Sequence, residues 1–214
     1  MSLRFDTNDP DERARGLEAA TSATRRGDLV VLPTDTVYGV GCDAFSALGV
    51  TRLLEAKRRG RDLPLPVLVG TPQTIEGLAY GLTKAARDLV EAFWPGPLTV
   101  VVRAQPSLTW DLGDAQGTVA LRMPLHPVAI ELLRVTGPMA VTSANVAGSA
   151  PATDYAGAEE QLVDSVAIYL DAGPLQHSAP STILDVTGPV PRLLRAGAFD
   201  LETLRSVCPD ITAD

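Results

Sequence analysis

A cluster of basic residues is the strongest candidate for an anion-binding site. Five of the 18 lysines and arginines lie within ten positions: Arg52, Lys57, Arg58, Arg59 and Arg61. The whole chain has a formal net charge of −8, so any anion site must be local. A local cluster can still focus positive potential. The cluster favours a phosphate site, with a solvated helix end as the alternative.

Composition excludes several classes of protein. The acidic balance argues against a protein that coats nucleic acid, because that affinity comes mainly from clustered Lys and Arg. Cys42 and Cys208 lie far apart, and His126 and His177 do not share a helix face with them, which argues against zinc. With no run of eighteen apolar residues and an acidic N-terminus, we expect a cytoplasmic protein without a membrane segment. We interpret Cys42 and His126 as structural.

Patterning places the basic cluster at the C-terminus of a helix. Residues 10–27 predict a first helix with acids first and bases last, and residues 29–32 predict a buried strand. A polar loop is expected over residues 34–43. Ser46 then caps a helix that buries Leu53 and Leu54 and ends in the cluster.

The rest of the chain alternates strands and helices. Further strands are predicted at residues 65–69, 98–102, 119–123, 139–142, 166–170, 182–186 and 192–194. Helices are predicted to begin near Pro72, Thr83, Pro127, Asp154 and Asp200. Phe93 and Trp94 are expected to anchor the core. Successive strands near the end predict a mixed sheet, so we expect one α/β domain over residues 1–214.

A glycine pattern offers an alternative function. Residues 39–44, GVGCDA, fit the G-x-G-x-x-A fingerprint of dinucleotide-binding proteins. Six residues separate the fingerprint from the preceding strand, whereas a Rossmann glycine follows its strand directly. An NAD(P)-dependent oxidoreductase is therefore a weak alternative. The phosphate-binding loop G-x-x-x-x-G-K-[ST] does not occur.

Several motifs in order resemble the YrdC/Sua5 family. Residues 33–41, PTDTVYGVG, resemble the opening of that family, and Lys57-Arg58-Arg59 resembles its K-x-R motif. The later matches are FWPGPLT at 93–99, R-x-P at 122–124, TSAN at 142–145, STI at 181–183 and LR-x-G at 194–197. Leu63 departs from the usual polar residue, so a contact there would come from the backbone or Arg61. The chain resembles the short, single-domain form, with its motifs in a core of about residues 14–200.

The resemblance implies a twisted mixed sheet with flanking helices around a concave cationic cavity. It also implies a threonylcarbamoyl-AMP synthase, a nucleotidyltransferase that condenses L-threonine, ATP and either bicarbonate or carbon dioxide, releasing pyrophosphate. Magnesium would arrive with ATP and keep several waters. The product would pass to a tRNA threonylcarbamoyltransferase complex that forms t6A.

The resemblance also implies roles for particular residues. Lys57 and Arg59 are expected to be catalytic, and Thr36, Arg122 and Ser181 to hold threonine, with Arg122 binding its carboxylate. The residues expected to bind ATP are Lys57, Arg59, Thr118, Ser143, Asn145, Thr153 and Arg195.

Two alternatives to this activity stay open. One is an RNA-binding module, because family members are associated with tRNA modification, although the negative charge leaves room only for a weak tRNA contact. The other is a relative that uses a different carbamoyl-type substrate. The K-x-R and S-x-N motifs together favour the threonylcarbamoyl branch.

Overall fold

The structure, a computed structural model, describes residues 2–176 and 179–213. The α-helices are α1 (Pro10–Arg25), α2 (Ala47–Lys57), α3 (Ile75–Leu78), α4 (Lys84–Phe93), α5 (Pro127–Thr136), α6 (Tyr155–Leu162) and α7 (Leu201–Arg205). The strands are β1 (Leu3–Asp6), β2 (Val30–Leu32), β3 (Gly39–Asp43), β4 (Val67–Leu68), β5 (Leu98–Arg103), β6 (Thr118–Arg122), β7 (Met139–Ser143), β8 (Ile168–Asp171), β9 (Thr182–Asp185), β10 (Arg192–Arg195) and β11 (Thr212–Ala213). Two 3-10 turns, Pro72–Thr74 and Val163–Ser165, precede α3 and β8.

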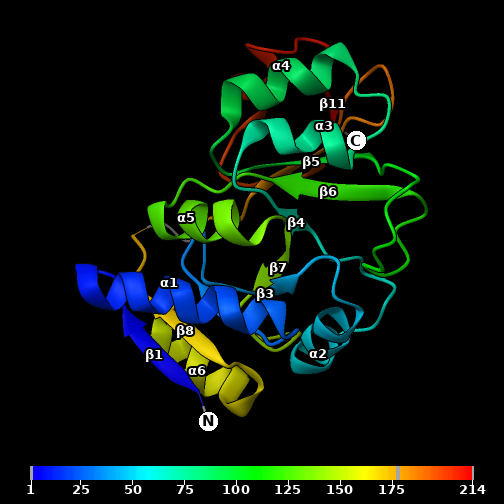
Figure 1. Cartoon of the computed structure of the whole chain (residues 1–214). Coiled ribbons are helices and arrows are strands. Elements are labelled where there is room, and N and C mark those ends of the chain that lie inside the picture. Colours follow the sequence, from blue (N-terminus) through cyan, green and yellow to red (C-terminus); the bar gives the residue numbers. More distant parts are fainter. Residues whose placement is uncertain (1, 177–178, 214) are drawn as a thin grey trace.

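All the strands form one mixed sheet, as the sequence predicts. Within the described residues its order is β1-β8-β2-β3-β7-β4-β6-β5-β9-β10-β11. The pairs β1–β8, β2–β8, β4–β6, β5–β9 and β10–β11 are parallel, and the others are antiparallel. The molecule is a single α/β domain in which helices flank a twisted sheet (Figure 1).

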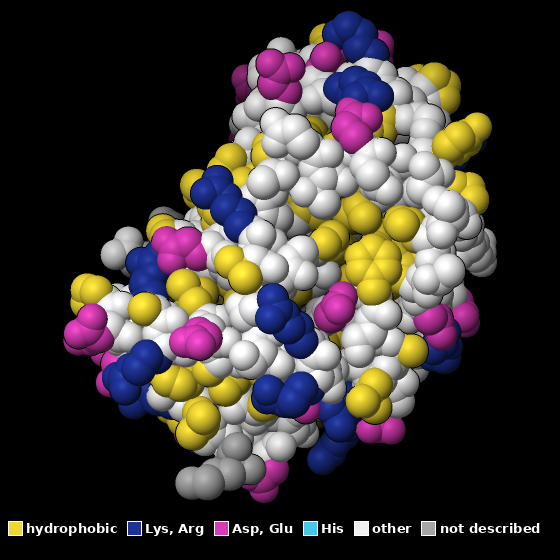
Figure 2. Space-filling model, in the orientation of Figure 1, with side chains coloured by type: hydrophobic (Ala, Val, Ile, Leu, Met, Phe, Trp, Pro, Cys, Tyr) yellow, Lys and Arg dark blue, Asp and Glu magenta, His cyan; other side chains and the backbone are white. Residues whose placement is uncertain are grey.

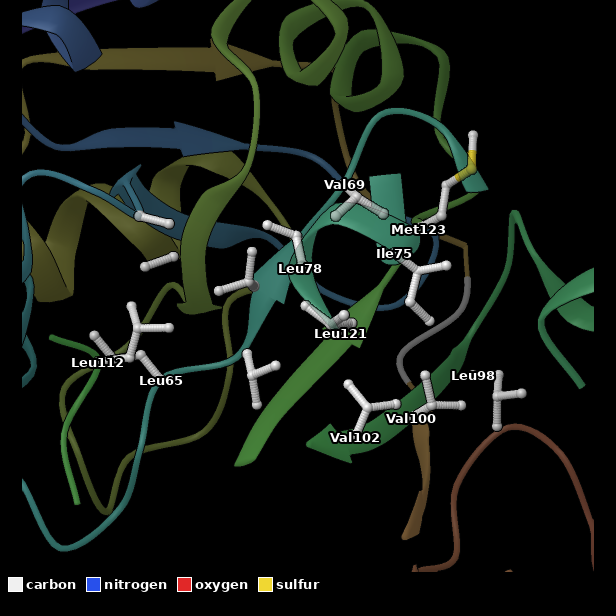
Figure 3. Packing of buried hydrophobic residues seen from close by; sticks show 14 of the residues in the cluster. Leu65, Val69, Ile75, Leu78, Leu98, Val100, Val102, Leu112, Leu121 and Met123 are labelled. Carbon is white, nitrogen blue, oxygen red and sulfur yellow. The ribbon is translucent and has the colours of Figure 1, made fainter. Parts of the chain in front are cut away.

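Helices cover the two faces of the sheet unequally. On one face α1 and α5 pack side by side over β2, β4, β7 and β8 and bury a small core around Leu132 and Met139 (Figure 1). The other face carries the larger core, against which α2, α3, α4, α6 and α7 pack. Figure 3 shows part of this core, where Val100 and Leu121 from neighbouring strands lie near Ile75 and Leu78. Burial of these apolar side chains is the main term that stabilises the layers.

Beyond α5, the face that carries the small core continues onto β6, β5 and β9. Register pairs Val100 with both Leu121 and Leu184, and all three point into the large core. Because side chains alternate along a strand, the residues between them point to the opposite face. Polar residues that point to this face are Thr99, Thr118, Arg122 and, just before β9, Ser181. Ala120, Val101 and Ile183 on the same face are only half-buried. The sheet therefore presents a partly open polar surface here.

The predicted polar loop over residues 34–43 is wrong in its second half, because residues 39–43 form β3. β3 pairs antiparallel with β2 and β7. A Cβ at Gly41 would lie 2.6 Å from the carbonyl oxygen of Ala140. The glycine thus permits close approach of two strands, within a strand that alternation alone does not reveal. A fingerprint glycine belongs in the turn after a strand, so the structure gives no support to the NAD(P) alternative.

Four of the predicted helix starts are confirmed by side-chain caps, whereas Pro72 begins a 3-10 turn and α5 begins at Pro127 without a side-chain cap. The side chains of Ser46, Thr83, Asp154 and Asp200 each accept a hydrogen bond from the backbone N–H three residues later. The sequence did not predict the terminal strands β1 and β11, which are short and exposed or half-buried. No helix in the described part of the chain is long and apolar enough to cross a membrane.

The two aromatic residues before Pro95 anchor the core, as predicted. Trp94 is buried, and its indole N–H donates to the carbonyl oxygen of Leu98 at 2.8 Å. Phe93 packs against Phe199 with ring centroids 4.8 Å apart. These contacts fix the segment that enters β5 and hold Gly96 beside the end of β6, where its N–H donates to the carbonyl of Met123.

Candidate functional site

The first part of the site surrounds Arg122 at the end of β6. Its Nε donates to the carbonyl of Gly96 at 3.1 Å, its Nη1 to Thr36 Oγ1 at 3.0 Å, and its Nη2 to Asp35 Oδ1 at 2.5 Å. Arg122 is only 7% exposed. Burial lowers its pKa, the nearby Arg195 lowers it further, and Asp35 opposes both. The guanidinium is thus a fixed, charge-compensated fork.

Ser181 and Arg195 extend the Arg122 cluster. Arg195 donates to the Ser181 carbonyl at 2.6 and 3.0 Å and to its hydroxyl at 2.9 Å, while Ser181 Oγ lies 2.8 Å from Thr99 Oγ1. Gly197 explains the close approach of the LR-x-G segment, because a Cβ there would lie 2.4 Å from the carbonyl oxygen of Pro180. The segments that carry Thr99, Ser181 and Arg195 therefore meet on the open sheet face, although they are far apart in the sequence.

The second part of the site joins α2 to the end of β7. Lys57 is 3% exposed, and its ammonium donates to the Ser143 carbonyl at 2.5 Å and to Asn145 Oδ1 at 3.0 Å. It also donates to the Asn145 carbonyl. Burial lowers the pKa of Lys57 to about 8, and Arg59 lowers it in the same direction. The K-x-R lysine thus holds the S-x-N loop in place.

Arg59 lies beside Lys57 and is less firmly held. Its Nη1 lies 3.5 Å from Thr142 Oγ1 and its Nη2 3.3 Å from the Pro64 carbonyl, while its buried Nε has no partner among the residues that the structure describes. Arg58 ends α2 in the left-handed conformation, with φ 50°, and so turns the chain between the two cations. Arg59 can still reorient its donors towards a ligand.

The departure at residue 63 leaves an apolar side chain on the surface. Leu63 is 56% exposed. Arg61, which the sequence offers as a substitute contact, forms an ion pair with Asp111 and is itself exposed. The Arg61 guanidinium therefore binds the loop that precedes β6.

Within the described residues, Thr118 and Thr153 form no hydrogen bond to either cluster. Thr118 opens β6 on the same face as Arg122, and its hydroxyl donates to the Ala115 carbonyl at 2.7 Å. The Thr153 carbonyl accepts from Leu175 N–H at 2.8 Å. Their predicted roles in ATP binding stay predictions.

Tyr38 connects three loops around the site. Its hydroxyl donates to the Gly173 carbonyl at 2.7 Å and accepts from the Ala172 N–H at 2.9 Å. Its own backbone N–H donates to the Ala152 carbonyl, and its carbonyl accepts from Ala144 N–H. The side chain is fully buried, and burial raises its pKa. Tyr38 therefore fixes the loop that carries Thr36 relative to the S-x-N loop.

The sequence missed two residues of the site. Asp35 forms an ion pair with Arg122, and Thr99 forms a hydrogen bond with Ser181. The sequence could have indicated Asp35 as a site residue, because it is the carboxylate inside the PTDT motif. For Thr99, the only indication was its position at the end of the FWPGPLT motif. Both matter because each contacts a residue expected to hold the amino acid.

Cys42 and His126, which we interpret from the sequence as structural, both lie outside the two clusters. Cys42 is fully buried, and burial raises the pKa of its thiol to about 12. His126 precedes α5, and burial lowers its pKa although nearby Asp35 opposes this. His177 lies outside the described residues. Among the described residues, no cluster of three His, Cys, Asp or Glu side chains could hold a metal ion.

Charges of both signs are mixed on the face that Figure 2 shows. Lys and Arg side chains alternate there with Asp and Glu, and among the described residues on this face no continuous basic patch forms. Such a surface is unlike the basic stripe typical of nucleic-acid-binding proteins.

The fold and site define an α/β protein with two polar clusters, one around a buried arginine fork and one around a buried lysine. A family model described as "Telomere recombination", for the Sua5, YciO and YrdC proteins, matches residues 22–197. The chain belongs to this family.

Known relatives match most of the chain. A Mycobacterium tuberculosis protein provisionally named as a threonylcarbamoyl-AMP synthase is 58% identical over 207 residues, covering 97% of this chain and 95% of the relative. Bacillus subtilis threonylcarbamoyl-AMP synthase is 34% identical, covering 98% of this chain and 60% of the relative.

The fold matches a solved family structure. Pyrococcus abyssi Sua5 complexed with L-threonine aligns with a TM-score of 0.92 and 32% identity, over 100% of this chain. The chain spans 62% of the length of that Sua5.

Proposed function

We propose that this protein is an L-threonylcarbamoyladenylate synthase, which condenses L-threonine, bicarbonate or carbon dioxide, and ATP into threonylcarbamoyl-AMP and pyrophosphate. The observation that supports this most strongly is the meeting of the family motifs in two clusters, one with an Asp35–Arg122 ion pair and one with a buried lysine bound to carbonyl and amide oxygens. The names of the family relatives support the same reaction.

The Arg122 cluster is suited to the amino acid. A guanidinium fork binds a carboxylate through two parallel hydrogen bonds, which fixes its orientation. Thr36 places a hydroxyl group beside that fork, and Ser181, whose hydroxyl accepts from Arg195, lies on the same face of the sheet. Without a ligand, hydrogen bonds to Gly96, Thr36 and Asp35 hold the Arg122 fork in position. The carboxylate of threonine would take the place of some of these contacts.

The Lys57 cluster is suited to the phosphates. Lys57 and Arg59 supply positive charge, while Ser143 and Asn145 supply polar groups on the loop that Lys57 holds. In the reaction, the carbamate oxygen of carboxylated threonine forms a bond to the α-phosphorus, and the bond to the leaving pyrophosphate breaks. Fixed cations stabilise the charge that develops on the phosphate oxygens. We therefore assign Lys57 and Arg59 as catalytic.

Magnesium would enter with the triphosphate. Asp35 is the acidic residue bound to the Arg122 cluster, and it already compensates Arg122. The described residues thus offer no carboxylate cage, which fits an ion held by phosphate oxygens and water. The metal would neutralise phosphate charge, and the chain's own residues position the two substrates.

The proposed product is an activated carbamate, which a transferase would consume to form t6A on tRNA. A mixed-charge surface and a net charge of −8 favour handing the product to a separate tRNA-binding complex. An RNA-binding role without the enzyme activity predicts gel-shift binding and no turnover.

Pyrophosphate release tests the proposal. Release should need ATP, Mg²⁺, bicarbonate and L-threonine together, and mass spectrometry should detect threonylcarbamoyl-AMP. Serine and valine in place of threonine give the amino acid controls. Equal release after bicarbonate is excluded would contradict the mechanism, because the carbamate oxygen that attacks would be absent.

A further inference from the structure

One carboxylate oxygen of Asp35 accepts no hydrogen bond from the described part of the chain. Its Oδ1 accepts hydrogen bonds from Arg122 Nη2 at 2.5 Å and from Leu125 N–H at 2.9 Å. Its Oδ2 is buried and has no hydrogen-bond partner among residues 2–176 and 179–213. Buried polar atoms are almost always paired, so an orphaned carboxylate oxygen needs an explanation.

The position of Asp35 suggests what its free oxygen binds. Its side chain is 12% exposed and forms an ion pair with Arg122, whose side chain is 9% exposed. Thr36, the next residue, binds the same guanidinium. Through the described residues, Asp35 is the only carboxylate hydrogen-bonded to the Arg122 cluster.

An α-amino acid needs both signs of charge in its site. Its carboxylate suits an arginine, and its ammonium has three donors and no acceptor, as a lysine ammonium does. The other side chains of the cluster offer hydroxyl groups or positive charge. A second cation alone would repel the ammonium. Of the described residues in this cluster, only Asp35 therefore supplies the complementary negative charge.

We propose that Asp35 Oδ2 accepts a hydrogen bond from the α-amine of the substrate amino acid. Arg122 and Asp35 then form a matched pair that recognises the two ends of a zwitterion. Asp35 is a specificity-determining residue that distinguishes an amino acid from a hydroxy acid of the same shape. This inference rests on the proposed function, because it takes the Arg122 cluster as the amino acid site.

The test compares L-threonine with its α-hydroxy analogue, 2,3-dihydroxybutanoate of matching configuration, by calorimetric titration. The wild-type protein should bind threonine roughly tenfold to hundredfold more tightly, as expected for one charge-assisted hydrogen bond. Asp35→Asn should reduce that preference to about threefold or less, because its amide keeps the shape but not the charge. Asp28→Asn, which alters a carboxylate paired with Arg26 and Arg52, is the matched control and should keep the wild-type preference.

The ratio of the two affinities separates recognition from positioning. If Asp35→Asn weakens both ligands equally, Asp35 acts only through Arg122 and the inference fails. Equal binding of both ligands by the wild-type protein also overturns it, and this comparison needs no variant to fold. If the wild-type protein binds neither ligand, that result contradicts the proposed function itself, and with it the inference on Asp35.

Discussion

The two clusters of the site differ in the groups that bind their cations. Arg122 forms an ion pair with Asp35 at 2.5 Å. Lys57, Arg59 and Arg195 have no carboxylate within ion-pair distance among the described residues, and carbonyl or hydroxyl oxygens accept their hydrogen bonds instead. The Arg122 cluster thus contains an ion pair of opposite charges beside Arg195, whereas the Lys57 cluster contains positive charge without a carboxylate partner among the described residues.

This difference matches the two proposed ligands. A zwitterion carries no net charge, so a compensated pair of opposite charges complements it. A triphosphate carries several negative charges, so cations without carboxylate partners complement it. Ligand selection between the two clusters therefore depends on which cation Asp35 compensates. Changes to the cations of each cluster should separate the two functions.

The largest effect should come from Lys57→Ala. The change removes an ammonium that holds the S-x-N loop and stands near the proposed phosphate site. We expect kcat for pyrophosphate release to fall about a hundredfold or more, as for the loss of one preorganised electrostatic contact.

Lys84→Ala is the control for Lys57→Ala. Lys84 is the other lysine, and it is exposed and paired with Asp88. Its replacement should leave kcat within about twofold of wild type, the range of a surface pair. If Lys57→Ala folds and keeps the wild-type kcat, Lys57 is structural only.

Arg122→Lys should have the next largest effect. A lysine keeps the charge but replaces a planar fork by a single donor group, so the orientation of the carboxylate is lost. We expect the KM for threonine to rise roughly tenfold to hundredfold, from the loss of one charge-assisted hydrogen bond. Arg134→Lys, on the last turn of α5, is the control. An unchanged KM in the folded variant would remove Arg122 from the amino acid site.

Raising the pH should weaken binding at the cationic cluster. Burial lowers the pKa of Lys57 to about 8, so this residue is charged at pH 7 and loses its proton as the pH approaches 9. The affinity for a nonhydrolysable ATP analogue should therefore fall up to about tenfold between these values, the effect of one charge-assisted contact.

The pH titration omits threonine, because an α-amine titrates in the same range. Lys57→Arg is the comparison for the pH dependence: its affinity should be lower than that of wild type at every pH, but its profile should be flat because arginine stays charged throughout. A wild-type profile as flat as that of the arginine variant would mean that Lys57 does not contact the phosphates.

The smallest expected effect is that of Thr118→Val, which tests how far the ATP site extends along β6. Thr118 shares a face with Arg122 but lies at the opposite end of the strand. Loss of one neutral hydrogen bond should weaken ATP binding about twofold to tenfold. Thr51→Val, on the exposed side of α2, is the control. Identical affinities in the two variants would exclude Thr118 from the site.

The sequence predicted most of the fold because its helix signals are local. Ser46 and Asp200 cap helices through contacts with residues three positions away, which a pattern reveals. β3 escaped prediction because its glycines serve contacts with β7, about a hundred residues later in the chain. A strand specified by long-range packing leaves a weak local pattern.

Prediction of the site was limited in the same way. The motifs identified Arg122, Lys57 and their neighbours, but a list of residues gives no pairing. That Asp35 compensates Arg122 and that Lys57 binds Ser143 and Asn145 follows from the folded sheet. The division of the cations into a compensated and an uncompensated group is therefore visible only in the structure.

The most direct test of this division is a reciprocal exchange of cations. Lys57→Arg and Arg122→Lys each preserve charge, and calorimetry measures the affinity of each variant for L-threonine and for a nonhydrolysable ATP analogue. The account predicts that Arg122→Lys weakens threonine binding and spares the nucleotide, whereas Lys57→Arg, which crowds a buried site, weakens the nucleotide and spares threonine. If Arg122→Lys instead abolishes nucleotide binding while threonine binds as in wild type, the division of the site between the two ligands is wrong.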